Sequence, residues 1–158
     1  MNTEFTQTRD LVLIGGGHAH ALVLKMWAMK PLAGARLTLI NPAPTAPYSG
    51  MLPGFVAGHY TSDELYIDLI RLARAAGARV VLGKAEFIDR ENKQVVVTGR
   101  PPIGYDVCSV DIGITSDMPD LTGFFEHAVP AKPLDDFARI WDGFCKSDTA
   151  EEVAVLGA

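Results

Sequence analysis

The chain has 158 residues with 14 basic and 19 acidic side chains, so its formal net charge is −5. This length predicts one domain, or two at most. The negative balance and the lack of a basic block exclude a nucleic-acid partner, because such a surface must displace counterions from phosphates. No apolar run approaches the roughly 20 residues of a membrane-spanning helix, so the sequence predicts no transmembrane segment.

The first strand, turn and helix form the most informative pattern. Residues 11–14 are branched and apolar, which is typical of a buried parallel strand, and three glycines follow. Residues 18–30 contain neither proline nor glycine, which predicts a well-buried helix that Pro31 stops. A glycine turn at this place lets a pyrophosphate approach the unpaired N–H groups of the helix N-terminus. A glycine turn without a ligand is the alternative.

Two residues depart from the usual dinucleotide-binding pattern. His20 stands where the third glycine would fall, which predicts either looser contact of helix and strand or a histidine tucked into a pocket. The second strand, residues 36–40, ends at Asn41, where an acidic residue that holds ribose hydroxyls is expected. Asn41 either binds a ribose without charge assistance or serves as a turn residue before Pro42.

Residues 42–60 contain four prolines and three glycines without clear periodicity, which predicts a long ordered loop. Within it, prolines and glycines fix the backbone of residues 47–54, where Tyr48, Ser49 and Met51 offer flat, polar and soft contacts. This segment is either a wall against a planar ring or a loop that packs on itself.

The following segment predicts a helix from Thr61. Thr61 and Glu64 are spaced as a capping box, and Ser62 is a competing N-cap. Apolar residues recur from Leu65 to Ala76, and Gly77 supplies the stop. The other predicted elements are a strand over 79–82, a hairpin or meander of 86–89 and 95–98, a strand over 107–112 and a helix over 134–146.

Residues 153–158 repeat the pattern of residues 11–15, a strand that enters a glycine turn. We therefore expect the chain to be the first part of something longer. The four histidines form no metal-ligand pattern, so no metal is expected. Cys108 and Cys145 form no CxxC pair, and the polar N-terminus does not resemble a signal peptide. These features favour a cytoplasmic location, with peripheral membrane association of a full-length protein left open.

Together the motifs resemble the N-terminal part of the FAD-dependent pyridine nucleotide–disulfide oxidoreductase superfamily. The nearest resemblance is to type II NADH dehydrogenase-like flavoproteins of the kind fused to selenide, water dikinase. Residues 11–20, 37–42, 80–89, 95–97 and 105–113 carry it, and residues 47–60 are similar to that branch. The last strand resembles the family's YD-x-L-x-x-A-T-G motif, with Asp111-Ile112-Gly113 in place of Ala-Thr-Gly.

The resemblance implies a truncated Rossmann-like α/β fold, a parallel sheet with a β-hairpin or meander insertion. Residues 1–150 would be the N-terminal part of an FAD-binding domain, and residues 151–158 would begin the first strand of a missing NAD(P)H-binding domain. The glycine turn would bind the FAD pyrophosphate, Asn41 and Pro42 would lie by the ribose, and the 84–85 backbone would meet the adenine. Residues 49–51 would approach the flavin, and residues 112–113 would close over the FAD. The implied cofactor-binding residues are Gly15, Gly17, His18, Ala19, Asn41, Pro42, Ser49, Gly50, Met51, Lys84, Ala85, Ile112 and Gly113.

The implied function is electron transfer from NAD(P)H through FAD to a quinone or another small acceptor. The paired redox cysteines of the disulfide reductases are absent, so no protein disulfide relay is expected, and the catalytic residues are unknown. We expect the chain alone to be inactive and to self-associate through surface exposed by the truncation. The alternative is a non-catalytic Rossmann-like nucleotide-binding or partner-binding module.

Overall fold

The computed structural model describes residues 8–114, 122–147 and 153–155. Its contacts divide the chain into two units, residues 1–113 and residues 114–158. Residues 153–155 lie outside any strand, and the rest of the strand predicted over 153–158 lies outside the described residues. The assignment of that segment to a further domain therefore stays a prediction.

The first unit is built on a four-stranded parallel sheet with the order β5-β2-β1-β9. Its strands are β1 (Arg9–Ile14), β2 (Ala35–Asn41), β5 (Arg79–Leu82) and β9 (Val107–Val110). All three neighbouring pairs are parallel, which confirms the predicted parallel sheet. β1 and β2 lie inside this sheet, and residues 12–14 of β1 and 37–41 of β2 are buried on both faces, as their apolar runs predict.

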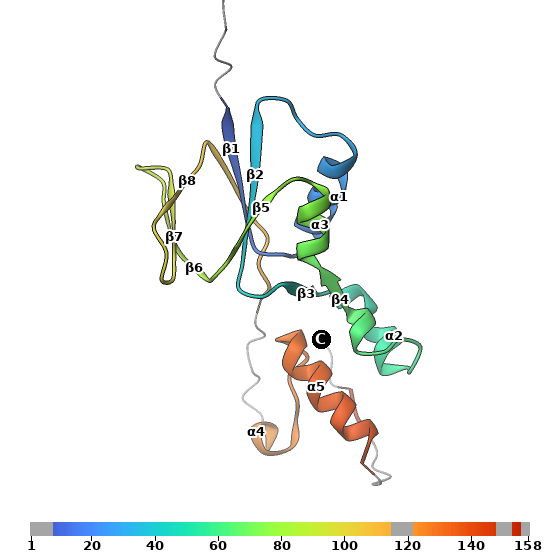
Figure 1. Ribbon diagram of the computed structural model, residues 1–158. Coiled ribbons are helices and arrows are strands. Elements are labelled where there is room, and N and C mark those ends of the chain that lie inside the picture. Colours follow the sequence, from blue (N-terminus) through green and yellow to red (C-terminus); the bar gives the residue numbers. More distant parts are fainter. Residues whose placement is uncertain (1–7, 115–121, 148–152, 156–158) are drawn as a thin grey trace, which may run out of the picture. The chain divides into compact units, whose positions relative to one another are not determined.

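Helices α1 (His18–Met29) and α3 (Leu69–Ala75) cover one face of this sheet (Figure 1). Leu13 and Leu39 of the strands pack there with Leu24 of α1. The helix α1 is less buried than its composition predicts. The apolar side chains on its outer face stay exposed, because only one side of the helix meets the sheet and α3.

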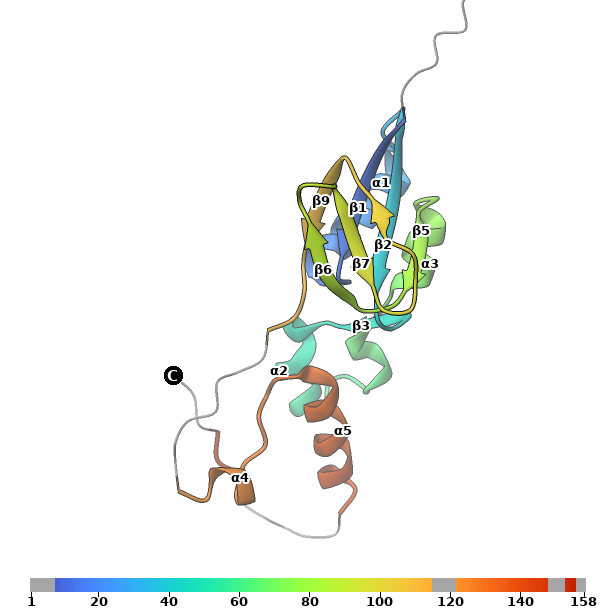
Figure 2. The same cartoon turned by 90° about the vertical axis from the view of Figure 1, so that its left-hand side faces the viewer.

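A three-stranded antiparallel sheet covers the opposite face (Figure 2). It consists of β6 (Ala85–Asp89), β7 (Gln94–Val97) and β8 (Ile103–Gly104). Apolar residues of this small sheet pack against residues of β1, β2 and β5 in a second core cluster. The predicted hairpin or meander insertion is thereby confirmed, and the first unit has three layers, two helices on one face and a second sheet on the other.

The segment predicted as one long loop contains regular structure. It forms the strand β3 (Thr45–Pro47), the 3₁₀ turn η1 (Ser49–Met51) and the short helix α2 (Leu52–Val56). β3 pairs with the antiparallel strand β4 (Tyr66–Asp68), a partner that lies about 20 residues away in sequence. Such pairing leaves no local periodicity from which a sequence could predict it.

The prediction of a helix from Thr61 is wrong at its beginning. The Thr61 N–H does donate to the Glu64 carboxylate at 2.8 Å, as a capping box requires, but this box supports only the 3₁₀ turn η2 (Asp63–Leu65). The helix α3 begins at Leu69 instead, and the Asp68 carboxylate caps it by accepting the Arg71 N–H at 2.8 Å. Pairing of β4 with β3 overrides the helical spacing between these two caps.

The second unit contains the helices α4 (Phe124–His127) and α5 (Leu134–Cys145). α5 agrees with the predicted helix to within one residue. Aromatic rings stack along it, with centroid distances of 6.2 Å from Phe137 to Trp141 and 5.6 Å from Trp141 to Phe144. Among the described residues, no helix is long and apolar enough to cross a membrane.

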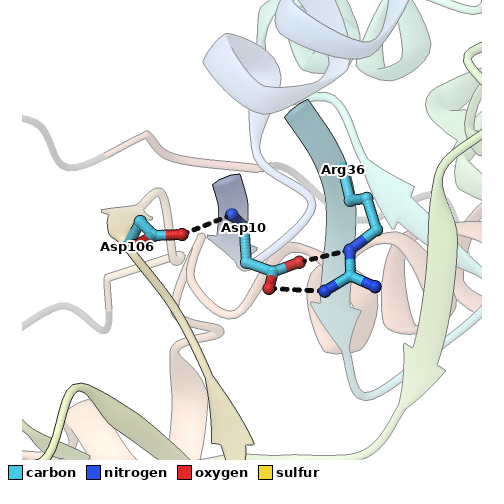
Figure 3. A network of polar contacts seen from close by, with 3 residues as sticks. All are labelled: Asp10, Arg36 and Asp106. Atoms are coloured by element: carbon cyan, nitrogen blue, oxygen red, sulfur yellow. Dashed lines mark hydrogen bonds and ion pairs between the residues drawn. The ribbon is translucent and has the colours of Figure 1, made fainter. Parts of the chain in front are cut away.

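A polar network joins the beginnings of three strands of the parallel sheet (Figure 3). Arg36 of β2 donates from Nε and Nη2 to the two carboxylate oxygens of Asp10 of β1, each at 2.8 Å. The Asp10 N–H donates to the Asp106 carboxylate at 2.7 Å, immediately before β9. The hydrogen bond from Arg36 lowers the pKa of the Asp10 carboxyl, burial opposes this shift, and the charge of Arg36 adds to it.

Replacing Arg36 with glutamine is expected to raise the pKa of Asp10 toward its ordinary value of 3.8. Because folding depresses this pKa, the pair stabilises the chain above the unfolded pKa, and its contribution is lost as the pH falls through the folded pKa. The Arg36 side chain is 68% exposed, so we expect little effect on stability at neutral pH. An NMR titration of the Asp10 carboxyl measures the shift. Arg139→Gln, in the second unit, should leave that titration unchanged, and an unchanged titration in the Arg36 variant would contradict the assignment.

Candidate functional site

The carboxyl ends of the four parallel strands lie along one edge of the sheet. Ile14 of β1 is in register with Ile40 of β2 and with Val110 of β9, and Asn41 is in register with Leu82 of β5. These ends and the segments that follow them contain every cofactor-binding residue predicted from the sequence. In open α/β sheets, ligands bind in the crevice outside this edge.

The glycine turn after β1 has a conformation that only glycine allows. Gly15 has a φ of +90°, and a Cβ there would lie 2.2 Å from the Asp111 carbonyl oxygen. A Cβ on Gly16 would lie 2.2 Å from Cδ1 of Leu69, at the beginning of α3. The Gly15 N–H donates to the Ile40 carbonyl at 2.8 Å, which fixes the turn against β2.

The N–H groups of the first helical turn have different partners. The Gly17 N–H donates to the Asp111 carbonyl oxygen at 3.3 Å, and the His20 N–H donates to the Asp111 carboxylate at 3.0 Å. The N–H groups of His18 and Ala19 have no partner among the described residues. Both residues are exposed. Two unpaired donors at the positive end of a helix can bind an anion.

Asp111 is a residue of this site that sequence analysis considered only as part of a strand motif. Its N–H donates to the Ile14 carbonyl at 2.8 Å, which places it at the end of β9 beside the glycine turn. Its carboxylate fills the space next to Gly17, where an added Cβ would lie 2.4 Å from Cγ and Oδ1. An acidic residue directly after a parallel strand, at the edge where a helix begins, is the signal that could have indicated this role.

His20 lies in a pocket, which is one of the two arrangements expected from the sequence. Its side chain is buried, and Nδ1 lies 2.7 Å from the Gly15 carbonyl oxygen. Because a carbonyl only accepts, we place the proton on Nδ1, and in the neutral ring Nε2 then accepts the Ser109 hydroxyl at 2.9 Å. His20 therefore connects the glycine turn to β9 through two hydrogen bonds. In the usual pattern, a third glycine at this position allows close packing of helix and strand instead.

Asn41 acts on the glycine turn through its side chain. The Gly16 N–H donates to Oδ1 of Asn41 at 2.9 Å, and Nδ2 of Asn41 donates to the Ala43 carbonyl at 2.7 Å. The buried amide group thus supports the turn and the chain that leaves β2, which agrees with the turn-residue alternative. Its contact with a ribose, and that of the exposed Pro42, stay predictions.

The segment after β3 packs both on itself and on the beginning of α1. The rings of His18 and Tyr48 stack with a centroid distance of 4.7 Å and an interplanar angle of 11°. A Cβ on Gly50 would lie 2.6 Å from the Tyr48 ring, so the glycine permits this packing. The stack brings η1, with the predicted Ser49, Gly50 and Met51, to the side of the helix N-terminus.

The remaining predicted residues lie at the same edge of the sheet. The Gly83 N–H donates to the Asn41 carbonyl at 3.0 Å, which brings the Lys84–Ala85 backbone beside the end of β2. The Lys84 carbonyl already accepts the Thr98 N–H at 3.0 Å. Ile112 lies next to the glycine turn, and a Cβ on Gly113 would meet open space. The structure thus gathers all of these predicted residues, while their roles toward a cofactor stay predictions.

Comparison with known proteins places this edge within a known fold. No family model and no curated protein matches the chain. Solved structures do match. The sulfide:quinone oxidoreductase of Aquifex aeolicus is 18% identical with a TM-score of 0.69, and the match covers 88% of this chain and 32% of that one. The reduced CoADR-RHD of Bacillus anthracis is 18% identical with a TM-score of 0.70 over 88% of this chain and 27% of that one. The NDH2 of Plasmodium falciparum, solved with NADH, is 16% identical with a TM-score of 0.65 over 87% and 29%.

The chain has the Rossmann-like fold of these oxidoreductases. The fold class predicted from the sequence is therefore confirmed, at identities that show the fold alone. The chain spans about a third of the length of these proteins. A relation to flavoproteins fused to selenide, water dikinase stays a prediction.

Proposed function

We propose that the chain is the FAD-binding portion of an NAD(P)H-dependent flavoprotein oxidoreductase. The observation that carries this proposal is the pair of unpaired N–H groups on His18 and Ala19, beside a glycine turn at the carboxyl edge of a parallel sheet. A pyrophosphate needs both features, donors aimed at it and a backbone without side chains in its way. The similarity in fold to oxidoreductases, one of them solved with NADH, supports the same proposal.

The residues at this edge fit an adenine dinucleotide. The His18 and Ala19 N–H groups are exposed and unpaired, and the neighbouring Gly17 adds no side chain of its own. Asn41 keeps one amide hydrogen beyond the one it gives to Ala43. The Asn41 side chain is the proposed contact of the ribose, and the Lys84–Ala85 backbone is the proposed contact of the adenine. Residues 49–51 would approach the flavin, and residues 112–113 would close over the FAD.

When bound, FAD supplies two-electron chemistry, taking hydride from NAD(P)H and passing electrons to an acceptor. The described residues of this chain would bind and orient it. The stacking of Tyr48 on His18 fixes the loop beside the helix N-terminus that would hold the pyrophosphate. A quinone or another small molecule is the proposed acceptor. The NAD(P)H site would belong to a segment after residue 151, so the 158-residue chain alone is expected to be inactive.

The open edge of the sheet supports the proposed self-association. Among the described residues β9 is the last strand on its side of the sheet, and its Val107 and Val110 side chains are more than half exposed. An apolar edge strand of this kind offers unpaired backbone groups to another chain. Light scattering is the direct measurement, and a monodisperse monomer at high concentration would contradict this expectation.

A second candidate is a non-catalytic nucleotide-binding module. The observation in its favour is that His20 and Asn41, which stand where the dinucleotide pattern has a glycine and an acidic residue, both contact the glycine turn through their side chains. This candidate predicts a colourless protein that ADP or NAD(H) stabilises against heat while FAD does not.

The visible absorption spectrum of the purified chain, incubated with FAD and then desalted, tests the proposal. We expect flavin bands to survive desalting, and Gly17→Trp to remove them because the indole would cover the helix N-terminus. Gly104→Trp places the same ring in β8, where the nearest atom beyond the neighbouring residues is 4.0 Å away, and it should retain the bands. Retention by the Gly17 variant would show that the flavin binds elsewhere.

A further inference from the structure

We propose that the Asp111 carboxylate is a built-in counter-anion of α1, which stabilises the free chain and limits its affinity for a dinucleotide. This inference rests on the proposed function, because it concerns the same helix N-terminus. According to this proposal Asp111, which lies outside the glycine turn, controls how tightly an anionic ligand binds.

The contacts show that Asp111 behaves as a helix cap supplied by another element. Gly17, at the N-cap position of α1, has no side chain to cap the helix. The Asp111 carboxylate accepts the His20 N–H at 3.0 Å, and the Asp111 carbonyl oxygen accepts the Gly17 N–H at 3.3 Å. Asp111, at the end of β9, thus caps α1 in the way that a serine or aspartate at the N-cap position usually does.

The electrostatics of this arrangement act in opposite directions in the free and bound states. A helix N-terminus carries about half a positive charge, so a carboxylate there is stabilising while the site is empty. A pyrophosphate that binds the neighbouring His18 and Ala19 N–H groups brings negative charge next to the same carboxylate. The contacts that the described residues make with this turn include no lysine or arginine side chain that would offset the repulsion.

Asp111→Asn separates the two effects, because the amide keeps an oxygen acceptor of the same shape and removes the charge. We expect the free variant to unfold at a lower urea concentration than the wild-type chain. We also expect it to bind FAD and ADP about two- to fivefold more tightly, which is the size of effect typical of a charge at a helix end. Asp111→Ser, a second neutral cap, guards against a folding defect peculiar to asparagine.

Asp106→Asn is the matched control. Asp106 precedes β9 as Asp111 follows it, and its carboxylate also accepts a backbone N–H, that of Asp10 (Figure 3). The two positions are five residues apart along an extended strand, roughly 16 Å at about 3.3 Å per residue. That exceeds the Debye length of about 10 Å in 0.1 M salt, so the control should lose stability without gaining affinity.

Fluorescence titration with FAD and calorimetry with ADP, each at 0.05 and 0.5 M salt, decide between the outcomes. Tighter binding by both Asp111 variants, with a difference from wild type that shrinks at high salt, supports the proposal. Equal or weaker binding by these variants, while the wild-type chain binds FAD, overturns it and leaves the proposed function intact. An equal gain in Asp106→Asn also overturns it, since the effect would then come from net charge. Failure of every chain to bind FAD or ADP removes the proposed function and this inference with it.

Discussion

Replacing Gly15 with alanine is expected to lower the free energy of unfolding of the first unit by about 2 to 5 kcal/mol. Two causes add at this position. An L-residue at a φ of +90° is strained by roughly 1 to 2 kcal/mol. The new methyl group would also lie 2.2 Å from the Asp111 carbonyl oxygen, a backbone atom that cannot turn away as a flexible side chain does. Relief of this clash must separate the glycine turn from β9.

Gly58→Ala is the matched control for this prediction. Gly58 has a similar φ of +77°, but a Cβ there meets no atom within 4 Å, so only the backbone strain remains. Urea unfolding followed by the fluorescence of Trp27, in a Trp141→Phe background, reports on the first unit. The excess loss in Gly15→Ala over Gly58→Ala measures the clash alone. Equal losses in the two variants would show that the turn and β9 do not meet as described.

The same clash has a consequence for binding. Displacing β9 from the turn also moves Asp111 and loosens the contact between Ser109 and His20. The first turn of α1 then lacks the contacts with β9 that hold its orientation. We therefore expect Gly15→Ala to retain less flavin than the wild-type chain even at temperatures where it stays folded, and Gly58→Ala to retain as much.

The sequence predicts well those elements that local patterns define. β5 has the predicted bounds because branched residues lie between two glycines, and α1 begins at the predicted residue because the glycines end there. The start of α3 was mispredicted, because a capping box at Thr61 and another cap at Asp68 both fit the local pattern. Only the pairing of β4 with β3 decides between them.

The site shows the same division between local and long-range information. The glycine turn and Asn41 follow from spacing along two strands. The cap supplied by Asp111 joins residues 91 positions apart, and the bond from Gly16 to Asn41 joins residues 25 apart. No local periodicity records such contacts, because they arise only when parallel strands bring their carboxyl ends together.

Leu69→Ala is expected to destabilise the first unit by about 2 to 5 kcal/mol and to loosen the glycine turn. Leu69 is 1% exposed and belongs to the core cluster between the parallel sheet and the helices. Its Cδ1 fills the space beside Gly16, so truncation leaves a cavity directly against the turn. Leu22→Ala removes the same atoms from a side chain of α1 that is 45% exposed, and it should change stability by less than about 1 kcal/mol.

A double-mutant cycle with Gly16→Ala identifies the contact itself. Alone, Gly16→Ala is destabilising, because its methyl group would lie 2.2 Å from Cδ1 of Leu69 in a packed core. In the Leu69→Ala background the same methyl group enters the vacated space. The double variant should therefore be more stable than the sum of the single losses predicts, by about 1 to 3 kcal/mol of coupling. Additive losses would mean that α3 does not support the turn through this pair, and the loosening of the turn would then need another cause.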